Sequence, residues 1–191
     1  MTTGRRTKQN NAGFSLLELI VVVLVLGILA GGMAVGISVV YNARSDSAAK
    51  KLYSMFTTAR ETAMAYSDGE TWITIIEKDN DLYAGIYVKE TGITELKAEE
   101  KLGSNRITVE LKASDQYVGG TTETSYKKVT TEGISIYYNS ANGGLRGQTA
   151  ELKKPSEGAE GNYYLTDIKV SGSETIEYIV IPETGRVLKN E

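Results

Sequence analysis

The longest hydrophobic pattern in the chain is an apolar run over residues 14–40, which is interrupted by a single carboxylate, Glu18. Residues 19–40 contain no charge at all, and about 20 apolar helical residues are enough to cross a bilayer core of about 30 Å. We therefore predict a transmembrane helix over residues 14–40, preceded by a polar leader at residues 1–13. A carboxylate near one end of such a helix costs free energy in lipid, so Glu18 needs an explanation.

The helical pattern continues beyond the apolar run. Small and apolar residues recur at steps of three and four along residues 48–66, and polar residues fill most of the positions between them. Gly69, which follows Ser67-Asp68, is a suitable end. We predict one helix over about residues 15–67, with an amphipathic continuation at residues 41–68 that packs on a sheet.

The rest of the chain, residues 69–191, alternates apolar and polar positions and is predicted to be an extracytoplasmic β domain. Turn-forming residues 78–81 separate the first two expected strands. Long loops are expected at residues 113–131 and 140–162, and Glu99-Glu100 between Lys97 and Lys101 indicates a solvated charge cluster. The predicted fold class is α+β, with an antiparallel sheet or sandwich against the helix. Its expected strands are residues 71–77, 82–89, 106–112, 133–139, 163–171, 175–182 and 186–189.

Three glycines, Gly31, Gly32 and Gly36, lie in the second half of the apolar run. Glycine in a helix interior costs roughly 0.5–1 kcal/mol relative to alanine, so the three together predict a soft helical segment. Close helix packing through small residues, as at the Gly32 and Gly36 spacing, explains them equally well.

Charge gives the segment an orientation. The leader holds Arg5, Arg6 and Lys8 and no acid, which predicts a cytoplasmic N-terminus and an exported remainder. The chain carries a formal net charge of −3 and the leader supplies three positive charges, which leaves −6 for the remainder and argues against non-specific nucleic-acid binding. A secretory signal peptide normally has an apolar region of about 7–15 residues, shorter than this one. A plain membrane anchor is the other alternative.

Composition argues against an enzyme. The chain has no Cys and no His, so it lacks thiolate chemistry, disulfides and the commonest general base. Asp79 and Asp81, with Asp68 nearby, could suggest a calcium loop, but they follow no EF-hand pattern and a solvated hairpin turn is favoured. The glycine-rich residues 142–147 lack the Lys-Ser/Thr of a phosphate-binding loop. We predict no catalytic residue, no metal and no cofactor.

The residues Gly13-Phe14-Ser15-Leu16-Leu17-Glu18-Leu19-Ile20 resemble the class III signal of type IV pilins and type II secretion pseudopilins. The resemblance implies that a prepilin peptidase cleaves between Gly13 and Phe14 and that the new Phe14 amine is N-methylated. It also implies that residues 14–40 form the filament core and that Glu18 pairs with a Phe14 amine, within the chain or on a neighbouring subunit. The alternative for Glu18 is an interfacial position without a partner. Many pilins have Pro where this chain has Val35.

A narrower resemblance, to the pseudopilin H (GspH/FimT) group, rests on Ala59-Arg60-Glu61-Thr62-Ala63 and on Ile179-Val180-Ile181 followed by Thr184-Gly185-Arg186-Val187. It implies a minor subunit. Some members of that group are thought to bind DNA through a basic C-terminal segment, which Arg186 and Lys189 partly match, although the net charge and the nearby Glu183 argue against DNA contact.

The expected function is that of a structural, minor subunit of a type IV pilus or a secretion pseudopilus. The implied partners are other pilin subunits, the prepilin peptidase, an assembly platform and the membrane, with no nucleic acid. The protein would reside in the cytoplasmic membrane and then in a surface or periplasmic filament. The alternatives are a single-pass anchor that displays a β domain for adhesion or binding, and a DNA-binding minor pilin for DNA uptake.

Overall fold

The structure is a computed structural model that describes residues 15–104, 106–115, 125–147 and 163–190; for residues 31–43 it describes the backbone alone. The chain divides into two units, Met1–Val39 and Val40–Glu191, which are described separately. One helix, α1 (Leu16–Ala65), runs through both. The predicted helix over residues 15–67 is confirmed to within two residues at either end.

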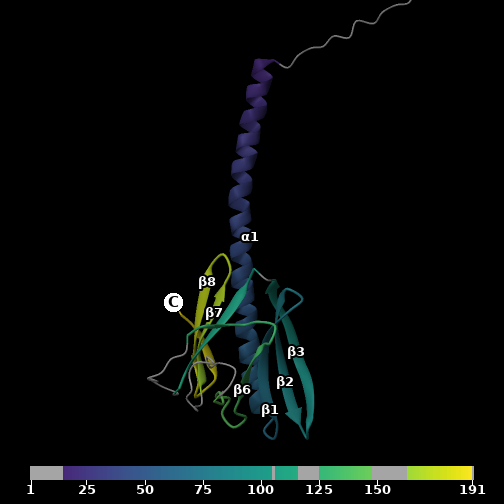
Figure 1. The fold of residues 1–191 in the computed structure, drawn as a ribbon, viewed down its shortest axis with the longest axis vertical. Helices are drawn as coiled ribbons and strands as arrows, with labels where there is room; N and C mark the ends of the chain where they lie inside the picture. Colours follow the sequence, from purple (N-terminus) through teal and green to yellow (C-terminus); the bar gives the residue numbers. More distant parts are fainter. Residues whose placement is uncertain (1–14, 105, 116–124, 148–162, 191) are drawn as a thin grey trace, which may run out of the picture. The chain divides into compact units, whose positions relative to one another are not determined.

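The second unit contains two antiparallel sheets (Figure 1). In the described residues, the strands follow the order β3-β2-β1-β6 in the first sheet and β5-β4-β7-β8-β9 in the second. This arrangement confirms the predicted α+β class. The strands are β1 (Glu70–Lys78), β2 (Asp81–Glu90), β3 (Ile93–Ser104), β4 (Thr108–Ser114), β5 (Lys127–Lys128), β6 (Ile134–Tyr138), β7 (Tyr164–Ser171), β8 (Thr175–Ile181) and β9 (Arg186–Lys189).

The second half of α1 packs against both sheets. Phe56 is fully buried, and its carbonyl accepts a hydrogen bond of 3.3 Å from the hydroxyl of Tyr138 on β6. Tyr53 stacks on Tyr178 of β8 with ring centroids 5.9 Å apart. Of the helix positions predicted from the three- and four-residue spacing, Tyr66 is only half-buried and lies beyond the end of α1. The others are in this core: Ala48, Leu52, Met55, Phe56, Ala59 and Ala63. Full burial of one large apolar side chain contributes about 1.5–3 kcal/mol, so this face anchors the helix to the domain.

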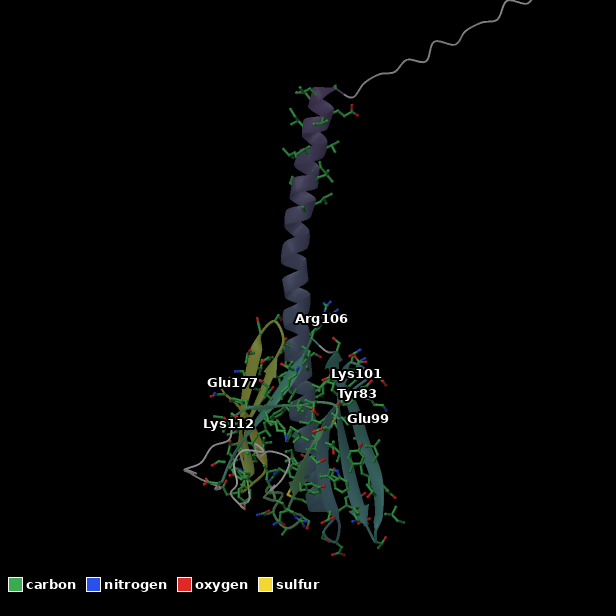
Figure 2. All side chains as sticks on the ribbon, viewed as in Figure 1. Tyr83, Glu99, Lys101, Arg106, Lys112 and Glu177 are labelled. Atoms are coloured by element: carbon green, nitrogen blue, oxygen red, sulfur yellow. The ribbon has the colours of Figure 1, made fainter. Side chains whose placement is uncertain are left out.

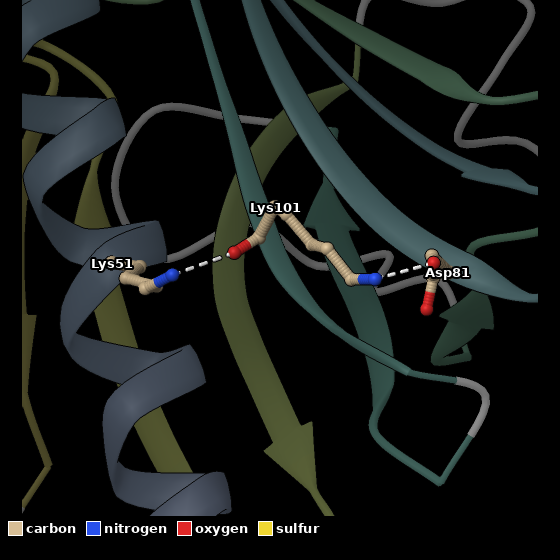
Figure 3. A network of polar contacts seen from close by, with 3 residues as sticks. All are labelled: Lys51, Asp81 and Lys101. Atoms are coloured by element: carbon tan, nitrogen blue, oxygen red, sulfur yellow. Dashed lines mark hydrogen bonds and ion pairs between the residues drawn. The ribbon is translucent and has the colours of Figure 1, made fainter.

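Polar contacts add a second link between α1 and the first sheet (Figure 3). The Lys51 ammonium donates a hydrogen bond of 2.8 Å to the Lys101 carbonyl, and the Lys101 ammonium lies 2.5 Å from the Asp81 carboxylate. The hydrogen bond to Asp81 raises the pKa of Lys101. Other charged side chains at the surface include the exposed Glu99 on β3 and the half-buried Glu177 on β8 (Figure 2). Water screens these exposed pairs, so they position β3 more than they stabilise it.

All seven predicted strands are present, each within two residues of its predicted ends. None of the predicted strands covers residues 90–105, where the structure has β3 at Ile93–Ser104. Two residues of β3, Lys97 and Leu102, have no partner in the register with β2, and each marks a bulge. Leu102, at the second bulge, lies in the core, where it is 4% exposed.

The predicted long loops need a partial correction. Residues 113–131 were expected to be a loop, but β4 continues to Ser114 and β5 pairs with it at Lys127–Lys128. Of the second predicted loop, residues 148–162 lie outside the described residues. Its described part forms a turn in which Leu145 bridges back to Tyr138.

The described part of that turn belongs to a contact that we call the clasp: residues 139–146 packed against residues 181–186 and Arg60. The Leu145 N–H donates a hydrogen bond of 2.7 Å to the Pro182 carbonyl, and Arg60 Nε donates one of 2.6 Å to the Thr184 carbonyl. Gly185 has a φ of +63°, and a Cβ placed on it would lie 2.0 Å from the Gly143 carbonyl oxygen. The clasp therefore joins α1, the first sheet and the second sheet through closely packed backbone.

Candidate functional site

The start of α1 is held by Ser15. Its hydroxyl oxygen accepts a hydrogen bond of 3.3 Å from the Glu18 backbone N–H, and its carbonyl accepts from the N–H groups of Glu18 (3.0 Å) and Leu19 (3.2 Å). This is the geometry of a helix N-cap, in which a side-chain oxygen satisfies an N–H of the first turn. The sequence analysis did not identify Ser15. The spacing Ser15-Leu16-Leu17-Glu18, which matches a capping box before an apolar run, is the signal that could have identified it.

Glu18 lies in the first turn of α1. A carboxylate there is favoured by the partial positive charge of the helix N-terminus. The residue is exposed and, among the residues that the structure describes, has no basic partner. Gly13 and Phe14, the predicted cleavage and methylation positions, lie outside the described residues, so the pairing of Glu18 with the Phe14 amine stays a prediction.

The helix that follows Glu18 is apolar on every side. Within the part of α1 whose side chains are described before residue 31, its large apolar residues are between 46% and 78% exposed. An apolar surface of this extent on an isolated chain marks an interaction surface. The residues are Leu16, Leu17, Leu19, Ile20, Val21, Val22, Val23, Leu24, Val25, Leu26, Ile28 and Leu29.

Over the residues that the structure describes, no helix has both the length and the apolar character that a membrane crossing requires. The transmembrane helix predicted for residues 14–40 therefore stays a prediction.

The two basic residues considered for DNA contact do not share a face of the second sheet. Arg186 and Lys189 are both exposed on β9, three residues apart. Val187 between them is 7% exposed and belongs to the core. Because side chains alternate along a strand, Lys189 lies on the side of Val187 and Arg186 on the opposite side.

The acidic residues considered for calcium have other structural roles. Asp79 and Asn80 have φ angles of 53° and 63°, which is the backbone of a two-residue turn between β1 and β2, as the turn prediction for residues 78–81 required. Asp81 pairs with Lys101. In the described part of the chain, no three His, Cys, Asp or Glu residues come close enough together to hold a metal ion.

Comparison with known proteins finds one match, which covers only the N-terminal segment. Residues 8–34 match the family described as the prokaryotic N-terminal methylation motif. No curated protein and no solved structure matches the chain. The match includes Gly13, Phe14 and Glu18, and it also covers Ser15 and the exposed apolar turns of α1. The chain therefore carries a prokaryotic N-terminal methylation motif at residues 8–34, consistent with a type IV prepilin or pseudopilin.

Proposed function

We propose that this protein is a minor structural subunit of a type IV pilus or of a type II secretion-like pseudopilus. In this proposal a prepilin peptidase cleaves between Gly13 and Phe14, the Phe14 amine is methylated, and the subunit polymerises through residues 14–40. The observation that carries the proposal is an N-terminal methylation motif that leads directly into a helix with exposed apolar residues on all sides.

The exposed apolar surface of α1 must be shielded from water both before and after the subunit enters the filament. Burying one of these side chains away from water contributes about 1.5–3 kcal/mol, so the helix is very unfavourable in water. Lipid covers it while the subunit resides in the cytoplasmic membrane with its N-terminus inside. Neighbouring helices cover it in the filament, outside the membrane. Because lipid and packed helices are similarly apolar, the assembly platform can move the subunit from one to the other.

Glu18 supplies specificity to this packing. A carboxylate surrounded by apolar helices is costly unless a positive charge accompanies it. Cleavage after Gly13 creates a cationic amine at Phe14, about one helical turn from Glu18. Pairing between Glu18 and the Phe14 amine of a neighbouring subunit would set the register between helices that hydrophobic contact alone leaves free.

The assignment as a minor subunit draws on two segments that resemble the pseudopilin H group. These segments, residues 59–63 and 179–187, contact each other in the clasp, where Arg60 Nε donates its hydrogen bond to the Thr184 carbonyl. Two sequence features that are far apart in the chain thus belong to one structural unit. This contact supports treating them as one shared feature instead of two separate coincidences.

Two measurements test the proposal. Mass spectrometry of the protein extracted from a host with an active prepilin peptidase should show a mature N-terminus at Phe14 that carries a methyl group. An intact Met1 N-terminus would contradict the proposal and favour a single-pass anchor. Glu18→Ala should leave insertion and cleavage intact and strongly reduce incorporation into filaments, whereas Glu18→Asp should retain part of it. Normal incorporation of Glu18→Ala would refute the pairing argument.

A further inference from the structure

We propose that Asn142 is a site of spontaneous deamidation, which the closed clasp suppresses and an opening of the clasp permits. The inference concerns the β domain and does not rest on the proposed function. Asn142 is the only asparagine in the sequence that precedes a glycine. Glycine has no Cβ to hinder a close approach to its nitrogen, and it adopts backbone angles that other residues rarely reach. At the Asn142–Gly143 step the backbone therefore reacts most readily with its own side chain.

The reaction requires only water. The Gly143 backbone nitrogen attacks the Cγ carbon of Asn142, and the new C–N bond closes a succinimide ring. The side-chain nitrogen of Asn142 leaves as ammonia and carries away the proton that the Gly143 nitrogen loses. Water then opens the ring at either of its carbonyl carbons. Opening at Cγ leaves an ordinary aspartate, whereas opening at the backbone carbonyl carbon leaves an isoaspartate, in which the main chain passes through the former side chain.

The reacting groups lie in different surroundings. Asn142 is exposed, so water reaches its side-chain amide, whereas Gly143 and Gly144 are buried. The Gly144 N–H donates a hydrogen bond of 2.9 Å to Asn142 Oδ1. A donor on this oxygen stabilises the negative charge that develops there during attack on Cγ. The amide is thus already polarised for the reaction, and protection must come from the surroundings of Gly143.

The clasp holds the attacking nitrogen in place. The Gly143 N–H donates a hydrogen bond of 2.8 Å to the Asn139 carbonyl, and the Asn139 N–H donates one of 2.7 Å to the Gly144 carbonyl. These bonds close the turn and retain the proton that Gly143 must lose. Arg60 and Met64 of α1 cover the turn, since a Cβ on Gly143 would lie 2.9 Å from Arg60 Cγ and 3.1 Å from Met64 Sδ. The nitrogen therefore cannot turn toward the asparagine Cγ while the clasp is closed.

Opening of the clasp controls the reaction and is in turn changed by it. Native proteins open locally at free energies below that of global unfolding, so the turn can be released while the core stays folded. An isoaspartate then lengthens the backbone of the turn. A Cβ on Gly144 would already overlap the Glu183 carbonyl. A Cβ on Gly185 would overlap the Gly143 carbonyl. The longer backbone does not fit this packing, so the modification keeps the clasp open.

The test follows deamidation over time in the full-length protein, in detergent at mildly alkaline pH. Peptide mass spectrometry locates the change from amide to carboxyl, and labelling with isoaspartyl methyltransferase detects isoaspartate. Asn139, which is followed by Ser and lies in the same tryptic peptide, is the internal control. We expect Asn142 to react at least about tenfold more slowly in the folded wild type than in the same protein unfolded in urea.

Three variants separate opening of the clasp from global unfolding. Arg60→Ala removes the side chain over Gly143 and the hydrogen bond to the Thr184 carbonyl, and alanine suits the helix. It should deamidate about three- to tenfold faster than wild type, as expected for one lost hydrogen bond. Gly185→Ala, whose new Cβ overlaps clasp backbone, should react at least about tenfold faster. Leu102→Ala weakens the core on β3, at the opposite edge of the first sheet from β6, and should react at the wild-type rate.

Each outcome decides the proposal. Faster deamidation in Arg60→Ala and Gly185→Ala, together with a wild-type rate in Leu102→Ala, supports it. Equal acceleration in all three variants overturns it and assigns the reaction to global unfolding. Equal rates for the wild type in its folded and urea-unfolded states also overturn it, because the clasp then gives no protection. If Gly185→Ala does not fold, Arg60→Ala decides, and a wild-type rate in that variant refutes control by the clasp.

Discussion

Replacing Gly185 by Ala should test the clasp more directly than any other single change. Gly185 has a φ of +63°, which costs an alanine about 1–2 kcal/mol. Its new Cβ would also lie 2.0 Å from the Gly143 carbonyl oxygen. The carbonyl oxygen belongs to the backbone, and the backbone fixes the position of a Cβ, so no side-chain rotation relieves the overlap. The two turns must move apart, which weakens the 2.7 Å hydrogen bond between Leu145 and Pro182.

The expected cost is the sum of three effects. Overpacking adds about 1–3 kcal/mol, and a weakened buried hydrogen bond adds about 1 kcal/mol. Together with the backbone cost of about 1–2 kcal/mol, Gly185→Ala should lower the free energy of unfolding by about 3–6 kcal/mol, a large part of the 5–15 kcal/mol typical of a domain.

Gly92 provides the matched control. It has a φ of +85° in the turn between β2 and β3, but a Cβ placed on it meets nothing within 4 Å. Gly92→Ala should therefore cost only the backbone term, about 1–2 kcal/mol. Urea unfolding in detergent, followed by the fluorescence of the single tryptophan, Trp72 on β1, measures both variants. Equal destabilisation by the two substitutions would refute the close packing of the clasp.

Two further predictions concern the core. Burial raises the pKa of Tyr138 above the value of about 10 that it has in the unfolded chain. Its contribution to the free energy of unfolding is therefore complete below about pH 10. Above that pH the unfolded state releases a proton that the folded state retains, so stability falls. Tyr138→Phe should lower the free energy of unfolding by about 0.5–1.5 kcal/mol at pH 7, because it loses the hydrogen bond to the Phe56 carbonyl. Between pH 9 and pH 11 the variant should lose less stability than wild type. Urea unfolding at pH 7, 9 and 11 measures both effects, and an identical pH dependence of the two proteins would contradict the prediction. Leu102→Ala should cost about 2–5 kcal/mol, because Leu102 is buried. Leu96→Ala, at a 50% exposed position of the same strand, should cost less than 1 kcal/mol, and similar losses in urea unfolding would contradict the burial of Leu102.

The elements that the sequence predicts correctly are those with local signals. The three- and four-residue spacing of small and apolar residues identifies the face of α1 that enters the core, and the cluster at residues 78–81 identifies the turn before β2. Alternation identifies β6, where Ile134, Ile136 and Tyr138 are all buried. In each case the residues that carry the signal lie within one helix, strand or turn.

Strand β3 escaped prediction for a physical reason. Its sequence is rich in Glu, Lys, Ala and Leu, which favour helix, and its alternation is broken twice by the unpaired residues Lys97 and Leu102. It forms a strand because β2 offers an edge along its whole length, which is a property of the tertiary structure. Charged residues and bulges are also how natural proteins protect an exposed edge strand from pairing with other chains. The charged residues and bulges that made β3 hard to predict are therefore suited to its position as an edge strand.

The same distinction explains which parts of the candidate site were predictable. The predictions of cleavage, methylation and Glu18 pairing rest on a few consecutive residues, and the capping spacing that identifies Ser15 is equally local. The clasp is different, because it brings together Arg60 and Thr184, which are 124 positions apart. A surface built from such distant segments has no compact sequence signal. The N-terminal segment can therefore be interpreted alone, whereas a partner of the β domain must be sought on surfaces that only the fold creates.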